Sequence, residues 1–131
     1  MKEIKMKKFK SFNRVSERPP NYPNGWIPVL ESSDLKVNET KPVFTCGYEL
    51  VVFRGPSGEA HVIDAFCPHL GAHFGMAAKV AKGRCGNDCI TCPFHGWVFR
   101  AKDGVCTDIP NFDSKYNIMY LLHYYTIITN V

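Results

Sequence analysis

Cysteine and histidine are frequent in this chain, which has six and five of them in 131 residues. Four lie in two short motifs, Cys67-Pro68-His69 and Cys92-Pro93-Phe94-His95, with 22 residues between them. Thiolate and imidazole are both strong ligands for transition metals, and each motif supplies one of each. Proline stiffens each motif, and the glycine that follows lets the backbone come near a bulky ligand. Cys67, His69, Cys92 and His95 are therefore the candidate metal ligands.

The way the four candidate ligands are divided between the two motifs indicates which kind of metal centre they form. A structural zinc finger usually takes two cysteines from one knuckle and two histidines from another. Here each loop gives one of each, which suits a binuclear centre with one iron on two cysteines and one on two histidines, the Rieske 2Fe–2S arrangement. Tetrahedral zinc on the same four residues is the alternative that the spacing leaves open.

The other cysteines give weaker signals. Cys85, Cys89 and Cys92 have the C-x₃-C-x₂-C spacing of radical-SAM enzymes, which bind a 4Fe–4S cluster. Those enzymes need a larger barrel, and its βα repeats are absent from this sequence. We therefore interpret Cys85 and Cys89 as free thiols in a loop. Cys46 and Cys106 fall in expected strands, where they pack as small apolar residues.

Three further histidines compete for the ligand role. His73 follows His69 by four residues, and spacing alone does not exclude it, although the C-x-H offset favours His69. His61 lies in the middle of an expected strand and His123 in an apolar segment. We interpret both of these as structural.

Short strands separated by turn signals must position these loops. Residues 49–54 and 60–66 are apolar and β-branched, and Gly55-Pro56-Ser57-Gly58 between them predicts a hairpin. Lys102-Asp103-Gly104 predicts a second hairpin, between residues 97–99 and 105–106. Trp26–Leu30 is a further apolar run, and the polar residues 77–90 are interpreted as a loop excursion. The pattern predicts an all-β domain.

Charge is concentrated at the start of the chain. The net charge is +4, and residues 1–14 alone carry +5, so the rest of the chain nets −1 and has no basic surface for nucleic acid. We interpret residues 1–20 as a basic tail without the apolar core of a signal peptide. The longest apolar stretch, 118–128, has eleven residues, which is short of the roughly twenty that span a bilayer. No transmembrane helix is therefore expected.

Cys67-Pro-His-Leu-Gly-Ala72 and Cys92-Pro-Phe-His-Gly-Trp97 together resemble the Rieske domain of Rieske-type oxygenases. The long loop between them and the sequence FCPHLGAHFG are most similar to the cholesterol 7-desaturase family of sterol oxygenases. The resemblance covers about residues 22–111. It implies a Rieske iron–sulfur domain, an antiparallel β-sandwich with a small cluster-binding subdomain made from two loops. It also implies that Cys67 and Cys92 hold the buried iron of a 2Fe–2S cluster, and His69 and His95 the outer one.

Departures from the family shape the functional expectation. Oxygenases of this group continue into a domain with a mononuclear iron on two histidines and one carboxylate, whereas only His123 follows His95 here. We divide the chain into a tail (1–20), a Rieske domain (21–111) and a divergent apolar segment (112–131). We expect one-electron transfer from a reductase, toward a separate or missing mononuclear-iron oxygenase domain, and no catalysis by this chain alone.

Two other functions stay open at this point, a free-standing Rieske ferredoxin and a zinc-stabilised interaction domain. The expected location is the cytoplasm or the cytoplasmic face of a membrane, because family members are often membrane-anchored. No anchor is evident in this sequence.

Overall fold

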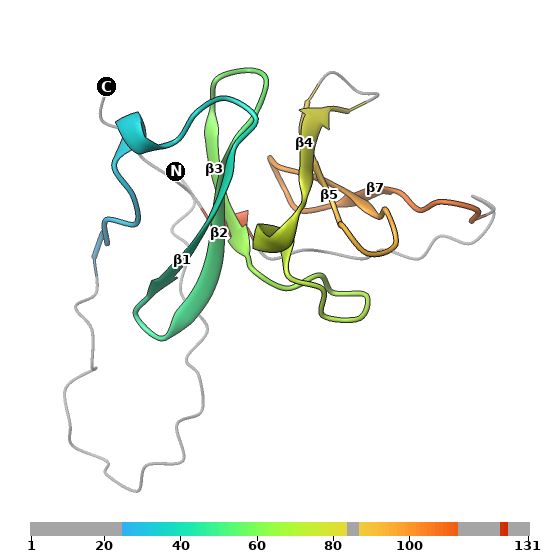
Figure 1. Ribbon diagram of the computed structural model, residues 1–131, viewed down its shortest axis with the longest axis horizontal. Coiled ribbons are helices and arrows are strands. Elements are labelled where there is room, and N and C mark those ends of the chain that lie inside the picture. Colours follow the sequence, from blue (N-terminus) through green and yellow to red (C-terminus); the bar gives the residue numbers. More distant parts are fainter. Residues whose placement is uncertain (1–24, 84–86, 113–123, 126–131) are drawn as a thin grey trace, which may run out of the picture.

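The computed structural model describes residues 25–83, 87–112 and 124–125 of the chain. Its described part is built from β-strands and two short 3₁₀ turns, with the strands in two antiparallel four-stranded sheets (Figure 1). The expectation of an all-β antiparallel fold is confirmed. The elements in chain order are η1 (Ser32–Asp34), β1 (Thr40–Thr45), β2 (Tyr48–Arg54), β3 (Ala60–Asp64), η2 (Phe74–Met76), β4 (Lys79–Lys82), β5 (Asp88–Thr91), β6 (Val98–Arg100), β7 (Cys106–Asp108) and β8 (Tyr124–Tyr125).

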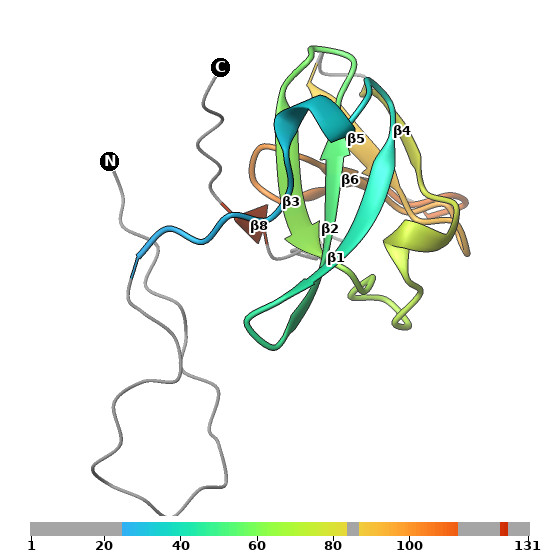
Figure 2. The same ribbon diagram turned by 60° about the vertical axis from the view of Figure 1, so that its left-hand side comes forward.

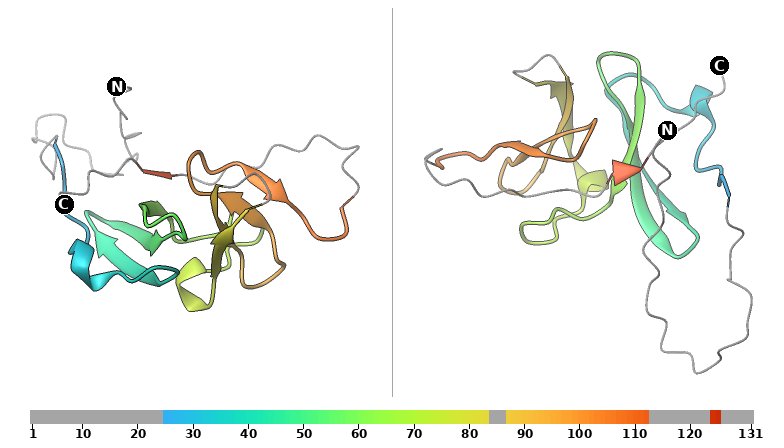
Figure 3. Two further views of the ribbon diagram at one scale, coloured as in Figure 1. Left: turned by 90° about the horizontal axis from the view of Figure 1, so that it is seen from above. Right: turned by 180° about the vertical axis from the view of Figure 1, so that it is seen from behind.

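The first sheet has the strand order β1-β2-β3-β8. The predicted Gly55–Gly58 hairpin joins β2 to β3, with Phe53 opposite His61 and Arg54 opposite Ala60. β8 pairs with β3 on the other side (Figure 3). β2 is buried on both faces, which explains its continuous apolar run in place of an alternating pattern.

The second sheet has the order β4-β5-β6-β7. Its β6–β7 connection is the predicted hairpin at Lys102–Gly104. The interpretation of residues 77–90 as a loop excursion is wrong, because they contain β4 and all of β5 but Thr91, and the two strands pair from Lys79–Thr91 to Lys82–Asp88. In β4, Lys79 and Ala81 are exposed and only Val80 packs against the core, so the strand depends on pairing with the buried β5.

The main hydrophobic core lies between the two sheets. Val51, Phe53 and Ile63 of the first sheet pack in one cluster with Ile90 and Phe99 of the second. A smaller cluster covers the opposite face of the first sheet, where Leu35, Leu50, Val52 and Val62 are buried. Alternation along each strand thus sends one set of side chains toward the second sheet and the other set away from it.

The segment before β1 covers the outer face of the first sheet (Figure 2). Arg54 anchors η1, because its guanidinium donates to the carbonyls of Ser32 (2.9 Å) and Leu35 (2.8 Å). Trp26–Leu30 forms no strand. Its residues Val29 and Leu30 pack against the smaller cluster instead, so the apolar run reflects burial without strand pairing.

The domain boundary expected at residue 111 stays a prediction, and β8 lies beyond it. The basic tail, residues 1–20, lies outside the described residues. Within the described part of the chain, no helix is long and apolar enough to cross a membrane.

Candidate metal centre

The first cysteine motif folds into a tight turn closed by its own backbone. The Cys67 N–H donates to the Ala72 carbonyl at 2.8 Å, and the Gly71 N–H donates to the Cys67 carbonyl at 2.9 Å. Gly71 has φ +75°, a left-handed conformation that glycine adopts without steric cost. The turn follows β3 after two residues, so the first sheet determines where Cys67 lies.

The second motif repeats this turn at the end of β5. The Cys92 N–H donates to the Trp97 carbonyl at 2.8 Å, and the Gly96 N–H donates to the Cys92 carbonyl at 3.2 Å. Gly96 also has φ +75°. Both turns therefore bond the cysteine to the residues four and five positions ahead. The two turns differ in the position of the candidate ligand: His69 is the second residue after Cys67, whereas His95 is the third after Cys92.

The two cysteines are buried in the main core, each with 3% of its surface exposed. The pKa of the Cys67 thiol is raised to about 11, mainly by burial and also by the adjacent Cys92 thiol, against a lowering effect of the His69 backbone. At neutral pH this thiol therefore carries its proton, and a metal that binds it must displace the proton. The structure thus brings together the two thiols that the sequence singled out.

The two histidines lie together at the surface side of the turns. Their ring centroids are 5.0 Å apart, with the planes at 73°. His95 is exposed and His69 is partly buried. Trp97 stacks on His69, with centroids 4.1 Å apart and planes at 12°, and so restricts that imidazole to one orientation. The stacking residue lies in the second motif, so the two turns hold each other in place.

This donor set fits a binuclear iron–sulfur centre. Two thiols point into a buried core and two imidazoles lie outside them, which matches one iron with cysteine ligands and a second with histidine ligands. A Cβ at Gly71 would meet no atom within 4 Å, so the space beside the first turn is open.

The competing histidines have other partners. The His73 Nδ1 accepts the Gly75 N–H at 2.9 Å and caps η2, while its Nε2 lies 4.0 Å from Glu49. His61 lies in β3, as expected, and its Nε2 is 3.1 Å from Asp88. His123 lies outside the described residues.

Among the other cysteines, Cys106 lies in β7 as expected. The expectation of a strand at Cys46 is wrong, because Cys46 lies in the β1–β2 turn with φ 51°. Cys89 is buried in β5 and not in a loop, so that part of the interpretation of Cys85 and Cys89 is wrong as well. Cys85 lies outside the described residues.

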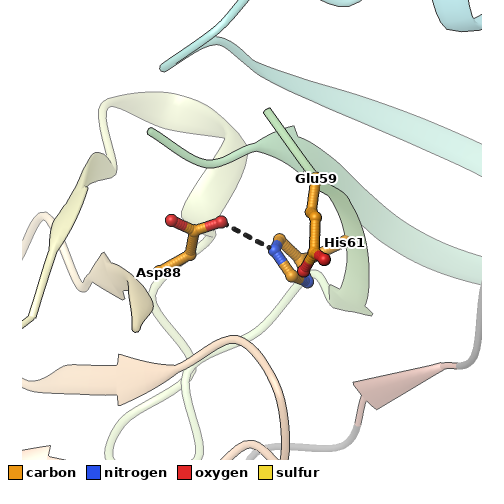
Figure 4. Close-up of side chains that lie close together, drawn as sticks. All are labelled: Glu59, His61 and Asp88. Carbon is orange, nitrogen blue, oxygen red and sulfur yellow. Dashed lines mark hydrogen bonds and ion pairs between the residues drawn. The ribbon is translucent and has the colours of Figure 1, made fainter. Parts of the chain in front are cut away.

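Two features of the site were missed from the sequence. One is the stacking of Trp97 on His69, which depends on contact between the two turns. The other is the grouping of Glu59, His61 and Asp88, whose donor atoms lie within 4.8 Å of one another (Figure 4). No local signal indicated either feature, because each one joins segments that are far apart in the sequence.

A large apolar residue stands next to each candidate histidine in the sequence. Leu70 and Phe94, at the tips of the two turns, are 73% and 77% exposed. Phe94 contacts His95, with ring centroids 5.1 Å apart. The tips of the two turns thus expose large apolar side chains, one of them in contact with the exposed imidazole of His95.

Comparison with known proteins gives consistent matches. The family described as the Rieske [2Fe–2S] domain matches residues 25–125. A cholesterol 7-desaturase of Hemicentrotus pulcherrimus is 52% identical over 97 residues, which are 74% of this chain and 20% of that protein. A cholesterol 7-desaturase of Drosophila melanogaster is 46% identical over 97 residues, 74% of this chain and 21% of that protein. This chain therefore spans about a fifth of the length of these relatives.

A solved structure agrees with these matches. The reduced complex between oxygenase and ferredoxin in carbazole 1,9a-dioxygenase contains a chain that superposes with a TM-score of 0.64 at 28% identity. The superposition covers 79% of this chain and 25% of that one. The family match over residues 25–125 contains both cysteine turns of this chain.

Proposed function

The chain belongs to the Rieske [2Fe–2S] domain family, and from that membership we propose that Cys67, His69, Cys92 and His95 hold the cluster and that the chain transfers single electrons. The bound cluster supplies the redox chemistry, while the protein determines its position and its potential. The observation that carries this proposal is the opposite exposure of the two ligand types. Both thiols are buried, and the imidazoles lie toward the solvent.

In this proposal the residues around the site have different roles. Cys67 and Cys92 attach the centre to the core between the sheets, away from water. His95 presents its imidazole at the surface, where a redox partner can approach closely. Trp97 fixes the ring of His69 from the protein side. Each residue therefore either shields the centre or exposes one edge of it.

The electron donor in this proposal is a reductase that docks on the end of the molecule bearing Leu70 and Phe94. These two side chains are the most exposed apolar groups of the cysteine turns. Burying them on contact would exclude water next to the imidazoles and shorten the path for the electron. The solved structure described above, a complex of oxygenase and ferredoxin, supports a redox protein as the partner, without identifying it as a reductase.

The acceptor in this proposal is the mononuclear iron of an oxygenase that acts on sterols. The names of the two curated relatives described above, both cholesterol 7-desaturases, support this substrate class. A free-standing ferredoxin role is less favoured, because these relatives are about five times as long as the aligned region.

The proposal is tested by loading the purified chain with iron and sulfide and recording its visible and electron paramagnetic resonance spectra. A Rieske cluster gives a coloured protein with two irons and two sulfides per chain and a paramagnetic reduced state. A zinc-stabilised interaction domain is colourless and gives no such signal, so a colourless protein with one zinc per chain would overturn the proposal.

The ligand assignment is tested by single substitutions. Cys67→Ala, His69→Ala, Cys92→Ala and His95→Ala are each expected to abolish the spectrum, because each removes one of four ligands. His73→Ala is the matched control, because His73 lies in the same loop but bonds to η2. A loss of colour in His73→Ala with colour kept in His69→Ala would show that the assignment is wrong.

A further inference from the structure

Two rows of side chains face each other across the core and lead to the cysteine turns. In β3 and its continuation, alternate residues Ile63, Ala65 and Cys67 all belong to the core between the sheets. Counting back by two along the strand places His61 on the same face. In β5 and the residue that follows it, Ile90 and Cys92 face this core, and Asp88 precedes them by the same alternation.

Each row therefore has a candidate ligand at one end and a polar residue at the other. The polar ends meet, because the His61 Nε2 lies 3.1 Å from Asp88 Oδ2 (Figure 4). His61 lies in the first sheet and Asp88, 27 residues later in the chain, lies in the second. Their contact therefore joins the two sheets. The two ligand-bearing strands are thus in polar contact at the ends away from their cysteines.

Asp88 is the one buried charged residue in the described part of the chain, with 7% of its surface exposed. Its Oδ1 accepts the Ser57 N–H at 3.1 Å, and its Oδ2 accepts the Ser57 hydroxyl. Burial would raise the pKa of Asp88, but the hydrogen bonds from Ser57 and His61 outweigh it and hold the pKa below its ordinary value. The carboxylate is therefore charged and saturated with hydrogen bonds at neutral pH.

The β2–β3 hairpin is shaped to receive this carboxylate. A Cβ at Gly55 would lie 1.9 Å from Asp88 Oδ2, so only glycine permits the approach. The Gly55 N–H donates to the Glu59 carbonyl at 2.9 Å and keeps the hairpin closed around Asp88. The contact thus involves backbone and side chains of the hairpin as well as His61.

We propose that Asp88, with His61 and Ser57, forms an inter-sheet bridge that positions the cluster ligands by fixing β3 against β5. The proposal rests on the cluster-binding function above. β3 leads to Cys67 and β5 to Cys92, so a bond that prevents the two strands from sliding also fixes the separation of the two thiols. Asp88 and His61 are positioning residues, because neither reaches the cysteine turns.

A divalent cation between Glu59, His61 and Asp88 is the other use of this group. It is not favoured, because the Asp88 carboxylate is already bonded to Ser57 and His61, and Glu59 is exposed. A cation would have to displace those bonds. The bridge accounts for the buried charge without a metal.

The test compares four variants of the loaded full chain at a temperature where all of them are folded. Asp88→Ala removes the bridge, and Gly55→Ala forces the carboxylate away without deleting it. Asp88→Asn keeps the shape and can still accept from the Ser57 N–H while its amide donates to His61. Val62→Ala is the matched control, because Val62 is buried on the other face of β3 and contacts the smaller cluster.

Two quantities are measured, the rate of iron loss to excess EDTA and, in the metal-free protein, hydrogen exchange at the Cys67 and Cys92 amides. Asp88→Ala and Gly55→Ala are expected to lose iron about tenfold faster than wild type. Both amides should also exchange faster in these two variants. Asp88→Asn is expected to stay close to wild type, and Val62→Ala to change both quantities less than Asp88→Ala does although it also lowers stability.

The proposal is overturned if Asp88→Ala loses iron no faster than Val62→Ala, or if the two cysteine amides are equally protected in both. Should Asp88→Ala fail to fold, Ser57→Ala removes a single hydroxyl and is expected to shift both quantities in the same direction. A wild-type chain that never forms a cluster would instead contradict the proposed function. In that case the amide exchange of the metal-free variants still decides whether the bridge exists.

Discussion

Trp97 shows how a single side chain controls a candidate ligand in this protein. The indole is 7% exposed and stacks on His69 on one side, and it packs against Phe99 of the core with ring centroids 6.4 Å apart. An imidazole at a protein surface otherwise rotates between several rotamers. The position of His69 is therefore transmitted from the core through one aromatic ring.

Replacing Trp97 with leucine removes this contact and part of the core. We expect Trp97→Leu to lower the free energy of unfolding by about 2–3 kcal/mol and to broaden the resonance signals of the loaded centre as His69 becomes less ordered. Urea unfolding and the linewidth of the reduced-state spectrum measure the two effects. Phe94→Leu is the control, because Phe94 is 77% exposed, and a change there larger than about 0.5 kcal/mol would be unexpected.

Asp88 makes stability depend on pH at the acid end. Its pKa is lowered in the folded protein, since burial raises it but hydrogen bonds from Ser57 and His61 outweigh that effect. The stabilisation is therefore complete above the unfolded pKa of about 3.9 and decreases as the pH falls through the lower folded value.

The stability difference between the wild type and Asp88→Asn is accordingly expected to shrink as the pH is lowered from 5. It is measured by urea unfolding of the metal-free proteins, so that protonation of the cluster ligands does not contribute. A difference that grows toward low pH would contradict the folded-state charge of Asp88.

At the scale of elements, the two cysteine turns depend on glycine in the left-handed conformation. Gly71 and Gly96 both have φ +75°, but their surroundings differ. No atom lies within 4 Å of a Cβ at Gly71, whereas Pro110 Cγ would be 3.1 Å from a Cβ at Gly96. A side chain at Gly71 is therefore opposed by the backbone conformation alone, and one at Gly96 also by Pro110.

Gly71→Ala is expected to lower the free energy of unfolding by about 1–2 kcal/mol, the cost of a left-handed residue with a side chain. Gly96→Ala should cost more, because Pro110 must also move. Thermal unfolding of the loaded proteins gives the order of the two effects. Equal losses in both variants would mean that the contact with Pro110 is relieved without cost.

The strands show which elements the sequence could predict and why. Residues 49–54 and 60–64 were predictable because an apolar run, a Gly-Pro-Ser-Gly turn and a second run specify a hairpin locally. β4 was not, because Lys79–Lys82 carries no apolar alternation and becomes a strand only by pairing with β5. Trp26–Leu30 has the opposite character, an apolar run that buries side chains without a strand partner.

The candidate site divides in the same way. The four ligands were evident because two cysteines and two histidines at fixed short offsets are a local signal. The inter-sheet bridge was not, because Ser57 and Asp88 are 31 residues apart and nothing in either segment indicates the other. Stacking of Trp97 on His69 likewise joins two turns whose distance in space depends on the packing of whole sheets.

At the scale of the whole molecule, the surroundings of the centre determine its reduction potential. Residues 66–74 and 92–97 contain no serine, threonine or tyrosine, and Ala72, Phe94 and Trp97 offer no hydroxyl to a sulfide. Fewer hydrogen-bond donors leave the added negative charge of a reduced cluster less stabilised. A less stabilised reduced state means a lower reduction potential.

We therefore expect a midpoint potential near the bottom of the range of roughly −150 to +300 mV that Rieske centres span. Protein-film voltammetry at neutral pH measures it. A midpoint above about +100 mV on that scale would show that backbone N–H groups around the centre supply the missing donors.

The two cysteine turns have the same pattern of backbone hydrogen bonds, so the backbone of one turn can serve in place of the other. Each turn closes on itself through bonds from its cysteine and its glycine, so neither needs its own imidazole to keep its shape. The histidine can then be moved along the second turn, for example by combining Phe94→His with His95→Leu, without a change in backbone conformation. The molecule is in this sense a ready-made template for designed metal sites, in which the arrangement of donors is chosen on a frame that stays the same.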